Sequence, residues 1–185
     1  MLIAQAKRKE NIAEYLLYMW QVEDMLRACQ IDDDKIDELL VARFVSMEGV
    51  TEETLKAIRQ WYHDLAAMML TEGKRESGHL QINEVVLADL TDLHQRLLRS
   101  GEDAIYTSAY YSTLPTIVEL RSHQGEHPQG ELETCFTALY GLLMLRLQGK
   151  EVSRETLGAM SQISKFVALL AEKYKEDKQQ TNNIE

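Results

Sequence analysis

Proline is almost absent from this chain, and its scarcity is the strongest constraint on the fold. Only two prolines, Pro115 and Pro128, occur in 185 residues. Because proline breaks helix interiors, its scarcity leaves long stretches free to be helical. Apolar residues recur in those stretches at alternating intervals of three and four, which is the period of one helix face. We therefore predict an all-α fold, a single-domain bundle of six to seven helices.

The helix boundaries follow from capping residues, glycines and one loop. We expect helices over residues 4–29, 32–46, 51–72, 82–100, 102–122, 131–148 and 153–175. Residues 1–175 would form the domain, and residues 176–185 a polar, frayed tail. Pro115 should kink or restart the fifth helix, because it removes a hydrogen bond to a carbonyl one turn earlier. The sixth helix is apolar nearly all round and should be buried, while the first should be central.

Two of these helices begin with the same local pattern. Residues 50–55 read VTEETL and residues 152–157 read VSRETL. In each, the hydroxyl of Thr51 or Ser153 should cap the first turn while the flanking valine and leucine pack together. The repeat could be the remnant of a duplication. Coincidence of good capping chemistry is the preferred explanation, because the preceding helices agree only in being apolar.

Charge and cysteine content restrict the partners and the compartment. The net charge is −10, which argues against nucleic acid, because binding the phosphate backbone needs a basic face. Cys29 and Cys135 are too few for a disulfide framework and suit a reducing compartment. We find no secretory signal, and no uncharged stretch approaches the ~18 residues of a membrane-spanning helix. We expect a cytoplasmic protein without nucleic-acid or membrane partners.

No motif in the chain indicates a metal, a cofactor or a catalytic residue. Asp33, Asp34 and Asp37 form an Asp-Asp-x-x-Asp pattern that can chelate magnesium, but no second acidic cluster accompanies it. Asp32, Asp33 and Asp34 open the second helix, and helix capping explains the acids of this pattern better. A di-iron site would need Glu-x-x-His pairs, which are absent. His123 and His127 are four residues apart, but the intervening Gly125 argues against a shared helix face.

A few charged and aromatic residues fall on helix faces that should be buried. Glu23 precedes Arg27 by one turn, which is the favourable order for a helical pair, and we expect each inward arginine to meet a carboxylate or a carbonyl. Arg121 and Arg146 also lie within apolar arcs, where an unpaired guanidinium is costly. These four could form an internal ion-pair network that fixes packing or a subunit interface. Alternatively they could line a pocket for a small anion, together with aromatic residues such as Tyr18 and Tyr110. His94 shares an apolar face and is interpreted as a core histidine.

Three segments resemble a bacterial family of unknown function. They are residues 11–24 (NIAEYLLYMWQVED), 114–121 (LPTIVELR) and 139–143 (LYGLL). The similarity would cover nearly the whole chain, but none of its motifs has a known chemistry. The resemblance implies an all-helical cytoplasmic protein without an assigned activity, and it transfers no functional residues.

Three functional hypotheses remain open. The first is a non-enzymatic helical interaction or regulatory domain, a homodimer or other homo-oligomer with a possible further protein partner. It rests on apolar helix faces in excess of what one bundle needs. The second is a small-anion or metabolite binder with a pocket near Glu23, Arg27, Arg121 and Arg146. The third is an enzyme that uses His94 or a tyrosine as acid or base.

Overall fold

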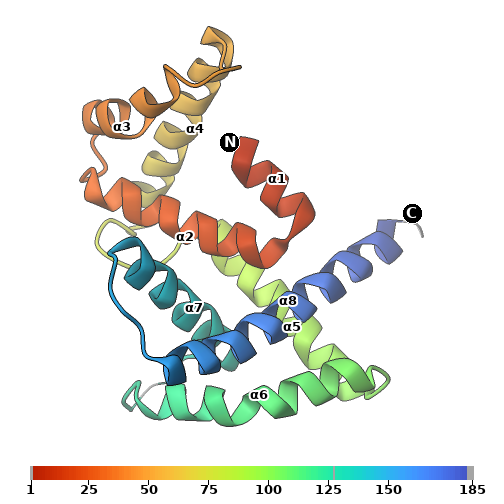
Figure 1. Ribbon diagram of the computed structural model, residues 1–185. Coiled ribbons are helices and arrows are strands. Elements are labelled where there is room, and N and C mark those ends of the chain that lie inside the picture. The colour runs from red at the N-terminus through yellow and green to blue at the C-terminus, as the bar shows by residue number, and fades with distance from the viewer. Residues whose placement is uncertain (1, 127, 183–185) are drawn as a thin grey trace. The chain divides into compact units, whose positions relative to one another are not determined.

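The regular elements of the chain are helices, which confirms the all-α class. The computed structural model describes residues 2–126 and 128–182, and no strand occurs among them (Figure 1). The elements in chain order are α1 (Leu2–Glu10), α2 (Ile12–Ala28), α3 (Asp33–Leu39), the 3-10 helix η1 (Val41–Phe44), α4 (Glu52–Thr71), α5 (Gln81–Ser100), α6 (Ala104–Ser122), α7 (Glu131–Leu147) and α8 (Arg154–Asn182).

The helices form two compact units. Unit 1 comprises the chain up to Lys9 together with Tyr18–Val85, and unit 2 comprises Glu10–Leu17 together with the chain from Val86 onward. Each unit has buried apolar residues of its own, and each is described separately below.

The first expected helix is in fact two helices. The predicted continuous helix over residues 4–29 is wrong, because α1 ends at Glu10 and α2 begins at Ile12. The side chain of Asn11 accepts hydrogen bonds from the backbone N–H groups of Ala13 (3.0 Å) and Glu14 (3.1 Å). Asparagine at this position satisfies two of the amides that every helix start leaves without a partner. The break therefore has a local cause.

The other helix starts agree with the capping chemistry in the sequence. The Thr51 hydroxyl accepts from the backbone N–H of Thr54 (3.2 Å), and the Ser153 hydroxyl from that of Thr156 (3.1 Å). Asp32 accepts from the N–H of Lys35 (3.0 Å), so the acidic run caps α3 as predicted. The helix expected over residues 32–46 is shorter, because α3 ends at Leu39 and η1 follows.

Unit 1 is built around α3, η1 and α4, which pack against one another. Buried apolar residues from α3, α4, the unit 1 part of α2 and the connection between α4 and α5 form its core. They include Val22, Leu26, Ile36, Ile58, Leu65, Met69 and Leu80. Because the Val22, Leu26, Ile36, Met69 and Leu80 side chains are fully removed from water, burial supplies most of the driving force for this unit.

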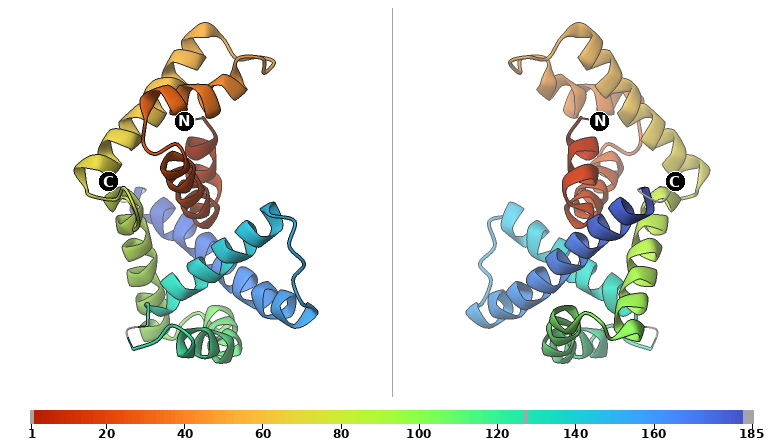
Figure 2. Two further views of the ribbon diagram at one scale, coloured as in Figure 1. Left: turned by 90° about the vertical axis from the view of Figure 1, so that its left-hand side faces the viewer. Right: turned by 90° about the vertical axis from the view of Figure 1, so that its right-hand side faces the viewer.

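Unit 2 is built on three helices, α6, α7 and α8, each packed against the other two. α7 and α8 cross, as both views in Figure 2 show. The core of this unit has a strong aromatic component, with Tyr106, Phe136 and Phe166 almost completely buried. α6 runs through Pro115 without a restart.

The ends of the last two helices differ from expectation. The predicted burial of the whole sixth helix is wrong for its second half, because the buried residues of α7 are Leu132, Thr134, Cys135 and Phe136. α8 continues as a helix to Asn182, into the segment expected to be a frayed tail.

Candidate functional site

Unit 1 contains a carboxylate that is completely removed from solvent. Glu23 of α2 is 0% exposed and accepts three hydrogen bonds. The donors are Nδ1 of His79 (2.6 Å), the backbone N–H of Leu80 (2.9 Å) and Nδ2 of Asn83 (2.7 Å). Leu80 directly precedes α5 and Asn83 lies in its first turn, so Glu23 places a negative charge at the amide-rich start of that helix.

His79 lies in the connection between α4 and α5, and its ring is held by two contacts, the hydrogen bond to Glu23 and a stack on Trp20. Its ring stacks on Trp20, with centroids 4.0 Å apart and planes 10° from parallel. Because an ionised carboxylate only accepts, the proton at the contact between Glu23 and His79 belongs to Nδ1 of the imidazole. The His79 side chain is 33% exposed. This arrangement can hold an imidazole in one orientation at a surface.

Arg27 does not pair with Glu23, but it meets a carboxylate and carbonyls, as expected of an arginine on a buried helix face. Its guanidinium instead contacts Oδ1 of Asp24 (2.7 Å), the carbonyl of Lys74 (3.3 Å) and the carbonyl of Gly78. Arg27 is half-buried, as befits a side chain that spans from α2 to the α4–α5 connection. Glu23 and Arg27 thus both fix that connection, one by accepting from its N–H and imidazole donors and the other by donating to its carbonyls.

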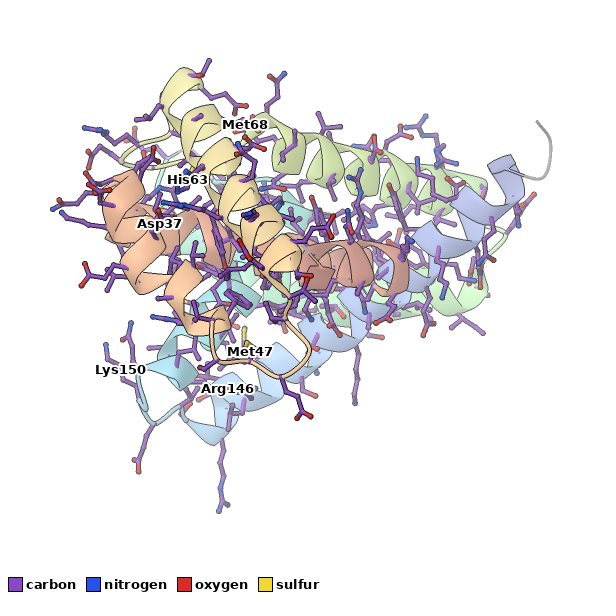
Figure 3. All side chains as sticks on the ribbon, turned by 90° about the horizontal axis from the view of Figure 1, so that it is seen from above. Asp37, Met47, His63, Met68, Arg146 and Lys150 are labelled. Atoms are coloured by element: carbon purple, nitrogen blue, oxygen red, sulfur yellow. The ribbon has the colours of Figure 1, made fainter. Side chains whose placement is uncertain are left out.

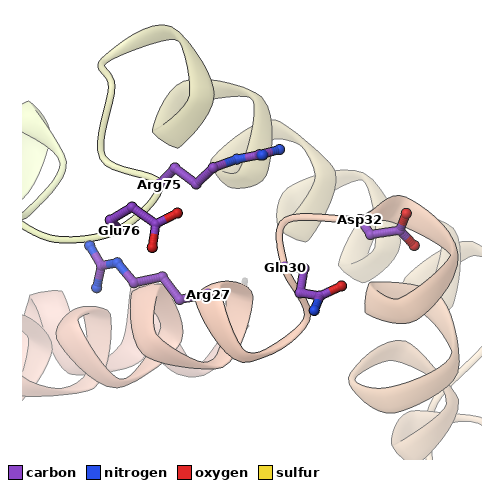
Figure 4. Close-up of a pocket in the computed structure, with 5 residues that line it drawn as sticks. All are labelled: Arg27, Gln30, Asp32, Arg75 and Glu76. Atoms are coloured by element: carbon purple, nitrogen blue, oxygen red, sulfur yellow. The ribbon is translucent and has the colours of Figure 1, made fainter.

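A cleft of about 540 Å³ opens beside Arg27 in unit 1. One wall comes from the end of α2 and the turn after it, and the other from the α4–α5 connection (Figure 4). The residues that line the cleft are Arg27, Gln30, Asp32, Arg75 and Glu76.

Unit 2 contains a second buried polar cluster, centred on His94 of α5. Its Nδ1 lies 2.7 Å from the Tyr106 hydroxyl, and its Nε2 lies 3.9 Å from Oε2 of Glu131. The same Glu131 oxygen accepts from the Tyr110 hydroxyl (2.9 Å), and Oε1 lies 3.9 Å from Nη1 of Arg121. Glu131 is the first residue of α7, so its charge is also favoured by the helix dipole.

Burial dominates the electrostatics of this second cluster. It lowers the pKa of His94 below its ordinary value, and the nearby Glu131 charge opposes that change only in part. The pKa of Tyr110 is raised to about 12, first by burial and then by its hydrogen bond to Glu131. Burial also raises the pKa of Tyr106. At neutral pH the imidazole and both phenols are therefore uncharged, which agrees with the predicted core histidine.

Neither cysteine has the properties of an activated nucleophile. Both are buried free thiols, and burial raises the pKa of Cys29 and brings that of Cys135 to about 12. A reactive cysteine needs a lowered pKa and an accessible sulfur. Within the described ranges, no group of three or more His, Cys, Asp or Glu side chains could hold a metal ion. His127, part of the histidine pair considered above, lies outside the described residues.

The last acid of the Asp-Asp-x-x-Asp pattern is bound to α4. Oδ1 of Asp37 lies 3.0 Å from Nε2 of His63 and 2.9 Å from Nε of Arg59. Figure 3 shows Asp37 and His63 next to each other on the facing helices α3 and α4. Asp37 therefore joins the two helices, and the capping role expected for this acid is wrong.

The six predicted site residues are divided between the units. Unit 1 holds Glu23, Arg27 and Tyr18, and unit 2 holds Tyr110, Arg121 and Arg146. Tyr18 is half-buried, and burial raises its pKa despite a hydrogen bond with Tyr62. Arg146 is exposed near the end of α7 (Figure 3), so its predicted burial is wrong.

Arg121 is only partly buried. Its side chain is 33% exposed, and Nε donates to the carbonyl of Gln129 at 2.9 Å.

Sequence reasoning missed His79, Asn83 and Glu131. Their partners are distant in sequence, and local periodicity carries no signal for such pairs. Only the position of Asn83 near a helix start offered a hint.

The fold and both polar clusters define the protein as an all-helical one whose buried charges are held by its own side chains and backbone. The chain belongs to a family described as a domain of unknown function (DUF4924), whose model matches residues 1–181. This confirms the resemblance to a family without an assigned activity. No curated protein and no solved structure matches the chain.

Proposed function

We propose that this protein is a non-enzymatic helical interaction module that associates with a second copy of itself. The observation that carries the proposal is the α7 apolar segment, which we define as Leu139–Leu147. No residue of this segment is buried, although it is composed mainly of large apolar side chains. Contiguous apolar surface of this kind marks sites of protein association.

The contrast within α7 supports the assignment. In the first turns of the helix, Leu132, Cys135 and Phe136 lie at or below 2% exposure. Further along, Tyr140 and Met144 are only half-buried and Leu147 is 62% exposed, at positions i, i+4 and i+7 of one face. Each apolar side chain left in water forgoes roughly 25 cal/mol per Å² of burial. A partner that covered this face would recover that free energy.

Charge favours a second copy as the occupant. The chain carries a net charge of −10, so most contacts between two copies would bring like charges together. Residues 135–145 contain no charged side chain. In a twofold-symmetric dimer the same patch lies on both sides, and the α7 apolar segment contains a single charged residue, Arg146, so little like charge is brought together.

The polar clusters favour a non-enzymatic role. Glu23 and His94 are held by partners within the protein, and both thiols stay protonated at neutral pH because burial raises their pKa. We further propose a cytoplasmic location, where two free thiols would stay reduced. None of the described helices is long and apolar enough to cross a membrane.

The experiment is sedimentation velocity at concentrations from about 1 to about 100 μM, a range that spans the dissociation constants of ordinary dimers. We expect a species of twice the 21.3 kDa chain mass. Leu147→Glu and Met144→Glu each place a charge against its symmetry mate and should weaken the dimer at least tenfold.

The matched control is Leu70→Glu on α4, where the apolar side chain is 47% exposed but lies outside the α7 apolar segment. It should leave the dimer intact. A monomer at every concentration would contradict the proposal. A dimer that resists both α7 substitutions but is lost in the Leu70 variant would place the interface elsewhere.

A specific observation also supports the alternative of a small-molecule binder. Of the six predicted site residues, only Arg27 lines the cleft in unit 1. If the protein binds a small molecule, the cleft beside Arg27 is therefore the place where we propose that it binds.

A further inference from the structure

We infer that the cleft of unit 1 binds a small zwitterion, a molecule of the α-amino acid class that carries a carboxylate and an ammonium group. The inference is independent of self-association. It rests on the cleft volume of about 540 Å³ and on the charges that line it.

The lining charges are balanced, which selects the class of ligand. Two guanidinium groups, Arg27 and Arg75, and two carboxylates, Asp32 and Glu76, line the cleft, and Gln30 supplies a neutral amide. Arg27 is already bound to Asp24 and to two carbonyls, and Asp32 caps α3, so Arg75 and Glu76 are the charges left for a ligand. A simple anion such as phosphate would be attracted by the arginines but repelled by the carboxylates. A simple cation would be attracted by the carboxylates but repelled by the arginines. A zwitterion can place its carboxylate on a guanidinium and its ammonium on a carboxylate.

Two of the lining residues have unused bonding capacity. Arg75 and Glu76 are exposed, and neither forms a hydrogen bond or ion pair within the part of the chain that the structure describes. Both extend from the α4–α5 connection at the same side of the cleft (Figure 4). A guanidinium offers five N–H donors in a planar fork that matches a carboxylate, so Arg75 is suited to hold one.

The walls of the cleft are fixed before any ligand arrives. Arg27 ties the α4–α5 connection to α2 through the carbonyls of Lys74 and Gly78. The opposite wall follows α2, where Gln30 (φ 59°) and Ile31 (φ 53°) adopt the left-handed conformation. This backbone conformation is costly for a β-branched residue such as Ile31, and it persists only where the surrounding structure enforces it. A pre-formed site loses less entropy when a ligand binds.

The test is a thermal-shift screen of the whole protein against the standard L-amino acids, each at about 10 mM, followed by calorimetric titration of any that raise the melting temperature. We expect at least one amino acid to bind. Its 2-oxo acid, which lacks the ammonium group, and its amine, which lacks the carboxylate, should each bind at least about tenfold more weakly.

Arg75→Gln and Glu76→Gln should each weaken the binding of that amino acid at least tenfold, because each removes one charge-assisted contact. Both side chains are exposed and have no protein partner within the described residues, so the melting temperature without ligand should not change. Arg154→Gln, at an exposed position at the start of α8 in unit 2, is the matched control and should bind like the unsubstituted protein.

Three results would overturn the inference. The first is that no amino acid raises the melting temperature at about 10 mM. The second is that the 2-oxo acid or inorganic phosphate binds as tightly as the amino acid, which would indicate a plain anion site. The third is binding that neither Arg75→Gln nor Glu76→Gln weakens, which would place the ligand elsewhere.

Discussion

The carboxylate of Glu23 on α2 accepts a hydrogen bond from the backbone N–H of Leu80, which is 57 residues further along the chain and directly precedes α5. A helix start is thus capped by a side chain from another helix rather than by its own neighbour. Because Glu23 is fully buried, water cannot replace it when it is altered.

The first prediction concerns this cap. Glu23→Gln keeps the shape of the side chain but removes its charge and puts an NH2 donor against Nδ1 of His79, so that contact survives only if the imidazole moves its proton to Nε2. We expect the free energy of unfolding to fall by about 3–5 kcal/mol in urea titrations. Glu38→Gln, an exposed position on α3, is the matched control and should cost less than about 0.5 kcal/mol. A loss below about 1 kcal/mol in the Glu23 variant would mean that the buried carboxylate contributes little.

The second prediction concerns the two hydroxyl caps. Thr51→Ala and Ser153→Ala should each lower the free energy of unfolding by about 1 kcal/mol, because a first-turn amide loses its acceptor. Thr51→Ser and Ser153→Thr retain the hydroxyl and should restore most of the loss. If the alanine and hydroxyl variants unfold at the same urea concentration, the hydrogen bonds of 3.2 and 3.1 Å contribute nothing measurable.

The third prediction is a pH dependence that originates at His94. The pKa of His94 is lower in the folded protein than the ordinary 6.5, so the unfolded chain takes up a proton first as the pH falls. Its contribution to stability is therefore complete above the unfolded pKa. It should decline as the pH drops through about 6.5 toward the folded pKa.

The measurement is the free energy of unfolding between about pH 5 and 8 for the unsubstituted protein and for His94→Gln, which cannot titrate. The difference between the two curves should grow smaller as the pH falls, because only the unsubstituted protein loses the contribution of a neutral buried imidazole. Parallel curves would show that His94 does not change its pKa on folding. The other histidines are present in both proteins and cancel in the comparison.

The fourth prediction compares the contributions of Arg121 and Arg146 to stability. The sequence placed both arginines on apolar helix faces. Arg121→Ala removes a hydrogen bond to the Gln129 carbonyl and a contact with Glu131, and should cost about 1 kcal/mol. Arg146→Ala changes an exposed side chain and should cost less than about 0.5 kcal/mol. Thermal and urea unfolding of both variants decides the matter, and equal losses would contradict the structural difference between them.

Local chemistry made much of the fold predictable. The caps at Asp32, Thr51 and Ser153 were identified correctly because a helix start and its hydroxyl or carboxylate acceptor lie within a few residues of each other. The helix break at Asn11 was not predicted, although its cause is also local. An asparagine between two helical stretches is a common N-cap residue. Helix periodicity placed Glu23 and His94 on buried faces correctly, because the face that a residue occupies follows from the apolar residues three and four positions away on the same helix.

The sequence by itself determined the helical class, most helix starts and that Glu23 and His94 lie inside. Only the tertiary structure decided their partners. Glu23 meets His79 rather than Arg27, and His94 meets Tyr106 and Glu131, because contacts between helices depend on how the chain returns through space. Periodicity also cannot show where a core ends. The apolar pattern of α7 continues to Leu147, yet no residue of the helix beyond Phe136 is fully buried, because the length of a buried face is set by the helices that cover it.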